Sequence, residues 1–132
     1  MIVADTNLVA YLLIEGTRTA AANAVWEKDS RWMLPTIWRS EFLNVLTTAM
    51  RADVLTLEQA HDMWQVALTI FGGSEVEPEG DDVLDLAAQH SLSAYDAQFV
   101  VAAADLEVPL VTDRRLLAAC ANLAVSPEGF VE

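Results

Sequence analysis

Four carboxylates occupy positions where this chain could assemble a reactive site. Two follow short apolar runs that are typical of buried strands, one falls in the first turn of a predicted helix, and one lies on a strongly apolar predicted helix. Because the carboxyl ends of parallel strands meet at one edge of a sheet, where open α/β folds build their sites, we expect the four side chains to converge there. In chain order these candidate catalytic residues are Asp5, Glu41, Asp96 and Asp113.

Such a cluster needs a cation. Carboxylates brought within a few ångströms of one another repel strongly, and burial adds a desolvation cost that a divalent metal ion can offset. The chain has one cysteine and two isolated histidines, so oxygen-only ligation favours Mg²⁺ or Mn²⁺ over zinc. A cation held in this way lowers the pKa of a bound water and stabilises charge on a phosphate, which makes metal-assisted phosphodiester hydrolysis the expected chemistry.

The helix that carries Asp96 is the most clearly marked element of the chain. Ser93 is a good N-cap residue, and Asp96 follows three positions later, where a carboxylate meets the positive end of a helix. Apolar residues recur at helical spacing as far as Leu106. Pro109 then breaks the periodicity, and Leu110-Val111 predicts a short interior strand that leads to Asp113.

The rest of the chain alternates between predicted strands and predicted helices. A helix over residues 35–51 places Glu41 and Asn44 on one face. The run Thr56-Leu57-Glu58-Gln59 has the spacing of a capping box that begins the next helix. This alternation predicts an α/β fold with a mostly parallel central sheet and helices on both faces. The length of 132 residues predicts one domain that spans residues 1–132.

Composition restricts the partners and the compartment. The net charge of −13 repels nucleic acid at long range, which argues against a simple nucleic-acid-binding module but not against a nuclease. Local cations must then hold a nucleic acid near the acids, and the candidates are Arg39, Arg114 and Arg115. A single cysteine fits a reducing cytoplasm, and no apolar run is long enough to span a bilayer. Four tryptophans in so short a chain predict apolar surface for a homodimer.

Four short motifs follow one another along the chain and resemble a known family. The motifs are Asp5-Thr6-Asn7, Glu41-Phe42-Leu43-Asn44, Leu92-Ser93-Ala94-Tyr95-Asp96-Ala97 and Val108-Pro109-Leu110-Val111-Thr112-Asp113-Arg114-Arg115-Leu116-Leu117. In this order and in a chain of this length, they resemble the small PIN domains of bacteria and archaea, the VapC-like toxins of type II toxin–antitoxin modules. The resemblance covers essentially the whole chain.

The resemblance implies a Mg²⁺- or Mn²⁺-dependent ribonuclease that hydrolyses RNA phosphodiester bonds with the four carboxylates named above. It implies a homodimer, and a cognate antitoxin protein that inserts a segment over the acidic groove. It also implies that three polar residues orient carboxylates or waters. These supporting residues are Asn7, Asn44 and Thr112.

One departure from the family pattern concerns the last strand. The family usually places one residue between the threonine and the aspartate there, whereas Thr112 and Asp113 are adjacent in this chain. Aligning the chain on Asp113-Arg114-Arg115-Leu116 keeps the acid and shifts the threonine. Asp113 and Thr112 are therefore the two site residues for which the sequence leaves the alignment open.

Two other functions are alternatives to this one. A HAD-like phosphatase also places an aspartate after its first strand, but it needs a second acid two residues later, and Asn7 occupies that position. A PIN fold that acts only as a non-catalytic interaction module is the other alternative. The presence of all four acids argues against it.

Overall fold

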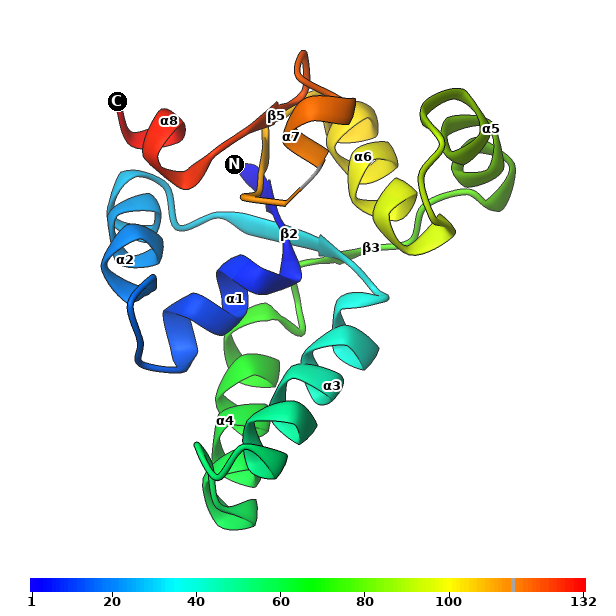
Figure 1. The fold of residues 1–132 in the computed structure, drawn as a ribbon. Coiled ribbons are helices and arrows are strands. Elements are labelled where there is room, and N and C mark those ends of the chain that lie inside the picture. Colours follow the sequence, from blue (N-terminus) through cyan, green and yellow to red (C-terminus); the bar gives the residue numbers. More distant parts are fainter. Residues whose placement is uncertain (115) are drawn as a thin grey trace.

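The centre of the molecule is a five-stranded sheet in which every pairing is parallel. The computed structural model describes residues 1–114 and 116–132. The strand order is β3-β2-β1-β4-β5, so the N-terminal strand occupies the middle of the sheet (Figure 1). This arrangement confirms the predicted α/β class and parallel sheet. The strands are β1 (Ile2–Ala4), β2 (Trp32–Pro35), β3 (Glu75–Val76), β4 (Leu110–Val111) and β5 (Ala124–Val125).

Helices connect the strands and enclose a hydrophobic core on each face of the sheet. Neighbouring residues of β1 point to opposite faces, with Ile2 and Ala4 in one core and Val3 in the other. Among the described residues, no helix is long and apolar enough to cross a membrane. The helices are α1 (Thr6–Leu13), α2 (Thr19–Lys28), α3 (Trp38–Arg51), α4 (Leu57–Phe71), α5 (Gly80–His90), α6 (Ala94–Leu106), α7 (Leu116–Ala119) and α8 (Pro127–Val131). A further apolar cluster lies between α5 and α6.

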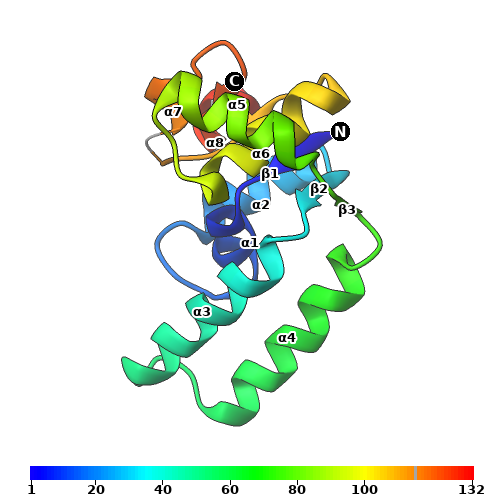
Figure 2. The same ribbon diagram turned by 90° about the vertical axis from the view of Figure 1, so that its right-hand side faces the viewer.

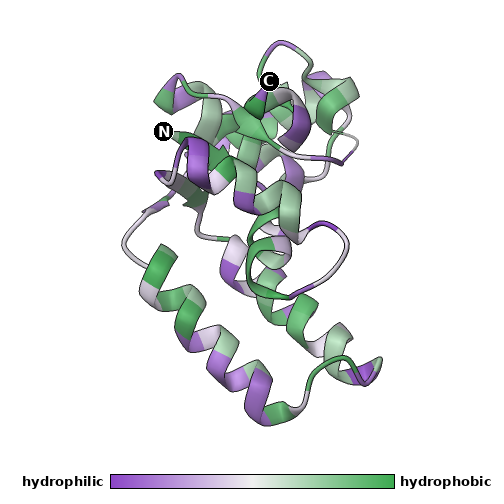
Figure 3. Cartoon of the chain, turned by 90° about the vertical axis from the view of Figure 1, so that its left-hand side faces the viewer, coloured by the Kyte–Doolittle hydropathy of each residue, from purple (hydrophilic) through white to green (hydrophobic). Residues whose placement is uncertain are grey.

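Helix α6 and the short helix α7 cover one of the two faces. Seven residues of α6 are buried, and four of them pack in a cluster with Val3 of β1, Leu110 of β4 and Leu116 of α7. The other face is covered by α1, by α2, by the first turns of α3 and by the last turns of α4. Figure 3 shows the consequence in colour, since hydrophobic and hydrophilic residues alternate along the helices.

Helices α3 and α4 form a hairpin that extends away from the sheet (Figure 2). At its base lies an aromatic cluster in which Trp32 stacks on Phe71 at 5.8 Å between ring centroids. Trp26 meets both rings edge-on, and Trp38 contacts Phe71 and Trp64. Trp32 and Trp38 are almost fully buried. The tryptophans therefore serve mainly as core, and they are not the exposed apolar surface that the composition alone suggested.

The helix starts agree with the sequence at two sites and differ at one. Ser93 accepts a hydrogen bond from the Asp96 amide at 3.1 Å, and the predicted capping box forms at the start of α4. The helix expected from residue 35 begins instead at Trp38. Pro35 is the last residue of β2 and pairs with Val76, because its fixed φ suits an extended strand end as well as a first helical turn.

The capping box yields a stability prediction. Thr56 accepts from the Gln59 amide at 3.1 Å, and the Gln59 side chain accepts from the Thr56 amide at 2.9 Å. Thr56→Ala leaves the Gln59 amide without its side-chain acceptor and should lower the free energy of unfolding by about 1 kcal/mol. Thr56→Ser, which keeps the hydroxyl, is the matched control and should lose far less. Urea denaturation of both variants checks the difference, and equal losses would show that the hydroxyl is not what stabilises this helix start.

Candidate active site

The carboxylates of Asp5, Glu41 and Asp96 surround one guanidinium at the carboxyl-terminal edge of the sheet. Asp5 follows β1 directly, Asp96 lies in the first turn of α6, and Glu41 lies in the first turn of α3. The guanidinium belongs to Arg114, which follows β4 by three residues. The structure thus brings together three of the four predicted acids, at the edge of the sheet where the sequence placed them.

Asp5 is the most deeply buried member of this cluster, with 1% of its surface exposed. Its Oδ2 accepts from the Thr112 hydroxyl at 2.5 Å and from Arg114 Nε at 2.6 Å. Its Oδ1 accepts from Arg114 Nη2 at 2.7 Å and, more weakly, from the Asn7 amide at 3.4 Å. The contact with Asn7 makes Asp5 the N-cap of α1, so capping and participation in the acidic cluster are both realised by the same carboxylate.

Asp96 lies across the same guanidinium from Asp5. Its Oδ1 is 3.5 Å from Arg114 Nη1, and its side chain is 9% exposed. The Ser93 cap fixes the first turn of α6 and so places the Asp96 backbone at the sheet edge. Two buried carboxylates from different elements therefore share one cation, which reduces the repulsion between them.

Glu41 approaches the cluster from the α3 side. Its Oε1 accepts a hydrogen bond from the Thr6 hydroxyl at 2.7 Å. Burial raises the pKa of the Glu41 carboxyl above its ordinary value, and the neighbouring negative charges of Asp5 and Asp96 add to that rise. The Thr6 hydrogen bond and the positive charge of Arg114 oppose it. The net rise means that protonation of Glu41 is easier in the folded protein than in water.

Arg114 remains firmly protonated in this setting. Burial disfavours its charged form, but the attraction and hydrogen bonds of Asp5, followed by the charges of Asp96 and Glu41, raise the guanidinium pKa overall. The ring of Phe99 also lies below the guanidinium carbon, at 5.9 Å from its centroid. Among the described residues of this cluster, the three carboxylates outnumber the guanidinium, so their negative charge favours a further cation.

The fourth predicted acid, Asp113, points to a different set of partners. Its Oδ2 accepts from the Tyr11 hydroxyl at 2.9 Å and lies 3.7 Å from Arg18 Nη2. Burial, followed by the hydrogen bond and charge of Asp113, raises the pKa of Tyr11 to about 12. Arg18 in turn donates to Glu128 of α8 at 2.5 Å, which ties Asp113 to a network on the α1 side of the sheet.

The supporting residues lie near the acids at different depths. Thr112 is buried against Asp5, whereas Asn7 and Asn44 line a hollow of about 180 Å³ beside Glu41 and Arg114. A second hollow of about 560 Å³ lies on the other side of Arg114. Its lining residues are Glu41, Ser93, Tyr95, Asp96 and Arg114. The surface over the acidic cluster is therefore an open groove that Glu41 and Arg114 divide.

The other candidate RNA contacts are placed differently. Arg39 donates to both carboxylate oxygens of Glu75 at 2.7 Å, and the Trp38 indole also donates to Glu75. Arg39 therefore has an acidic partner on β3. Arg115 lies outside the described residues.

The donor chemistry of the cluster suits a hard divalent cation, but the observed arrangement suits a guanidinium. All the candidate ligands are carboxylate oxygens, which Mg²⁺ and Mn²⁺ prefer. In the part of the chain that the structure describes, no group of three or more acidic, histidine or cysteine side chains is arranged to hold a metal ion. The oxygens of Asp5 already accept hydrogen bonds from Arg114 and Thr112.

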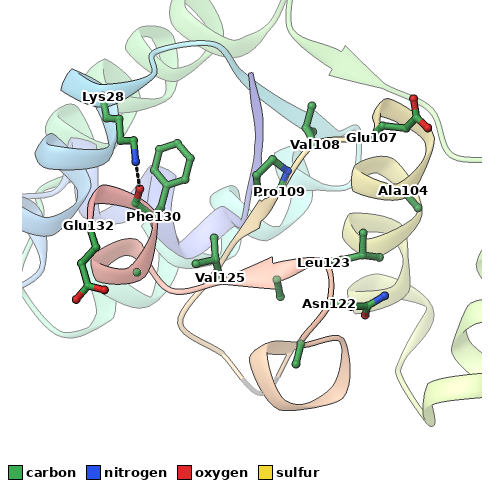
Figure 4. A pocket seen from close by; sticks show the side chains of 13 residues that line it. Lys28, Ala104, Glu107, Val108, Pro109, Asn122, Leu123, Val125, Phe130 and Glu132 are labelled. Carbon is green, nitrogen blue, oxygen red and sulfur yellow. Dashed lines mark hydrogen bonds between the residues drawn. The ribbon is translucent and has the colours of Figure 1, made fainter.

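A further hollow lies elsewhere, at the amino-terminal edge of the sheet (Figure 4). It measures about 850 Å³ and is lined by residues of α6, β5 and α8 together with Lys28 and Pro109. Lys28 donates to the Phe130 carbonyl and lies over the Phe130 ring, so its charge is engaged with α8. This hollow contains none of the candidate catalytic residues.

The sequence did not single out Thr6, Tyr11 or Arg18 as contributors. Thr6 was visible within the Asp5-Thr6-Asn7 motif, where a hydroxyl beside a strand-end acid suggests a hydrogen bond to a neighbouring carboxylate. Tyr11 and Arg18 carried no such signal, because their contact with Asp113 spans about a hundred residues of sequence.

Comparison with known proteins identifies the family of this chain. The family model described as PIN domain matches residues 2–121. Among curated protein sequences, none matches the chain significantly.

Several solved structures share the fold over nearly the whole chain. PAE2754 from Pyrobaculum aerophilum superimposes with a TM-score of 0.76 at 23% identity, covering 99% of this chain and 96% of its own. A toxin-antitoxin complex from Klebsiella pneumoniae gives 0.70 at 19% identity, with 96% and 98% covered. FitAcB from Neisseria gonorrhoeae gives 0.72 at 17% identity, with 97% and 99% covered.

The raised pKa of Glu41 predicts a pH dependence of stability. The folded state binds the Glu41 proton more tightly than the unfolded chain, so this residue's contribution is fully present below the ordinary value of 4.5 and is lost as the pH rises through the folded-state pKa. Glu41→Gln does not titrate at this position and can still accept from Thr6. Its stability relative to the parent protein should therefore increase as the pH rises from about 4.5 to neutrality.

Urea denaturation in metal-free buffer at both pH values measures this change. The exposed Glu27→Gln is the matched control, since it removes the same charge from the surface of α2. A stability difference between Glu41→Gln and the parent that does not vary with pH would contradict the raised pKa.

Proposed function

Because the chain belongs to the PIN domain family, we propose that it is a ribonuclease that depends on Mg²⁺ or Mn²⁺ and acts as the toxin of a type II toxin–antitoxin pair. The observation that carries the proposal is the convergence of Asp5, Glu41 and Asp96 around the guanidinium of Arg114 at the open edge of a PIN fold. Membership of the PIN domain family also argues against a HAD-like phosphatase. Such an enzyme needs a second acid at position 7, where this chain has Asn7.

Asp5, Glu41 and Asp96 are the residues that hold the divalent cation in this proposal. A divalent cation held by these residues would supply an activated water and would stabilise the charge that develops on the phosphate. Asp113 completes the predicted acidic set, although in the present conformation it is engaged by Tyr11 and Arg18.

Hydroxyls and amides of this chain orient the acids. Thr112 donates to Asp5 and Thr6 donates to Glu41, so each carboxylate presents a defined edge to the groove. Asn7 and Asn44 line the hollow beside Glu41, where their side chains are available to position waters or substrate oxygens. These positions are consistent with our proposal that Asn7, Asn44 and Thr112 orient carboxylates or waters.

We assign the RNA contact nearest the reaction centre to Arg114. A protein with a net charge of −13 cannot attract RNA through its overall field, so a local cation must hold the phosphate backbone. Arg114 borders both hollows of the groove, whereas Arg39 is neutralised by Glu75. Such a contact positions the strand without reading its sequence.

A cognate antitoxin is the proposed protein partner. One structure with the same fold is a toxin-antitoxin complex, that of Klebsiella pneumoniae. The acidic groove of this chain is open and negatively charged, so the segment that covers it should carry basic residues.

We also propose that the chain forms a homodimer through the α3–α4 hairpin. Residues of both helices line a hollow of about 290 Å³, and most of the lining side chains are apolar. Leu43 and Leu57 lie at this hollow and are 45% and 64% exposed, respectively. Burial of such exposed apolar groups favours self-association.

The ribonuclease assignment predicts the loss of cleavage in two variants. Asp5→Asn and Asp96→Asn each remove a negative ligand, so cleavage of RNA with Mg²⁺ or Mn²⁺ should fall to background in both. The exposed Asp85→Asn on α5 is the matched control and should retain full activity. Circular dichroism of each variant verifies folding.

Two outcomes of this experiment would contradict the proposal. Full cleavage by either variant would remove that residue from the site. An inactive parent protein that shows no stabilisation by Mg²⁺ or Mn²⁺ would instead favour the non-catalytic interaction module.

If the homodimer forms through the α3–α4 hairpin, a charge introduced into the hairpin should weaken the dimer. Leu57→Glu places a carboxylate in the apolar hollow and should shift the protein toward monomer at micromolar concentration. Leu84→Glu on α5, where the leucine is 65% exposed, is the control and should leave the dimer intact. Sedimentation velocity measures both, and a parent protein that is monomeric under these conditions would refute the dimer.

A further inference from the structure

Arg114 lies between Asp5 and Asp96, two of the carboxylates that we propose as ligands of a divalent cation. Its Nε and Nη2 donate to the two carboxylate oxygens of Asp5, and its Nη1 lies 3.5 Å from Asp96. The guanidinium therefore uses all three of its nitrogens on two carboxylates. Such a fork is the strongest arrangement available to an arginine and an acid.

The sequence register explains why a cation occupies this position. Thr112 keeps the place of the threonine in the family pattern, because its buried hydroxyl donates to Asp5. One residue separates the threonine from the acid in that pattern, so the acid is expected at position 114. This chain carries Arg114 there, and its acid lies one residue earlier, where Tyr11 and Arg18 hold Asp113.

We propose that Arg114 is a tethered cation that competes with Mg²⁺ or Mn²⁺ for Asp5 and Asp96, so that a divalent ion binds only as the guanidinium withdraws. The inference rests on the proposed function, because it assumes that these carboxylates bind a divalent ion.

Competition follows from the donors that Asp5 already accepts. Oδ2 accepts hydrogen bonds from the Thr112 hydroxyl and from Nε of Arg114. Oδ1 accepts hydrogen bonds from Nη2 of Arg114 and from the backbone amide of Asn7. A metal ion needs at least one free lone pair on this carboxylate, at a distance shorter than a hydrogen bond. A divalent ion at that distance also repels the positive guanidinium, and burial strengthens the repulsion. The two cations therefore exclude one another.

The groove leaves room for Arg114 to withdraw. The residue is 29% exposed, and it lines the hollows on both of its sides. A side chain that moves into either hollow stays beside the acids, where it can contact a phosphate of the RNA backbone. One residue thus neutralises the site without metal and contacts substrate once metal is bound.

Calorimetric titration with Mn²⁺ tests the competition without any RNA. Arg114→Gln should bind Mn²⁺ more tightly than the parent by roughly tenfold or more, because a like charge leaves the site. Arg114→Lys keeps the charge and should remain near the parent value. Arg39→Gln is the matched control, since it breaks an arginine–carboxylate fork at Glu75 instead. Adding Asp5→Asn to Arg114→Gln should cancel the gain.

The outcomes separate this inference from the proposed function. Mn²⁺ affinity that is equal or weaker in Arg114→Gln overturns the competition but leaves the metal site in place. Absence of Mn²⁺ binding in the parent and in Arg114→Gln overturns both the competition and the metal-dependent function.

A measurement on the parent protein covers the case in which Arg114→Gln does not fold. The Nε–H of Arg114 donates to Asp5 at 2.6 Å, so its side-chain NMR signal should be protected from exchange with water. Mg²⁺ should move this signal and remove its protection. A signal that stays unchanged when the protein is saturated with Mg²⁺ would overturn the competition.

Discussion

Repulsion among carboxylates at one edge of the sheet is the constraint on which the rest of the site depends. Asp5, Glu41 and Asp96 come from three separate elements, and the fold holds them close together while most of their surface is away from water. The fork between Arg114 and Asp5 offsets that repulsion in the protein without metal. The same fork determines how accessible the acids are to any other cation.

The sheet order makes this convergence possible. With β1 in the middle, the residue after it is covered on both faces and flanked by the ends of β2 and β4. Asp5 is therefore buried at the centre of the edge, and the first turns of α3 and α6 bring the other acids to it from opposite sides. The adjacent residues Asp113 and Arg114 then diverge, one toward α1 and the other toward Asp5.

The parallel α/β fold, the Ser93 cap and the capping box at Thr56 were all predictable, because each depends on residues close together in sequence or on a regular pattern. The start of α3 and the role of the tryptophans were not. Pro35 is compatible with both a strand end and a helix start, and only the pairing with Val76 selects between them. Burial of Trp38 depends on α4, which the local pattern does not place.

The sequence by itself determined which acids can meet, since strand ends and helix starts are local features and parallel strands end at one edge. It left open whether Thr112 or Asp113 keeps its place in the family pattern. Tertiary structure decided the partners of both residues, because Thr112 donates to Asp5 and Asp113 accepts from Tyr11 across more than a hundred residues. The position of Arg114 among the acids follows from those two contacts, and distance in sequence is the reason that no local pattern could reveal it.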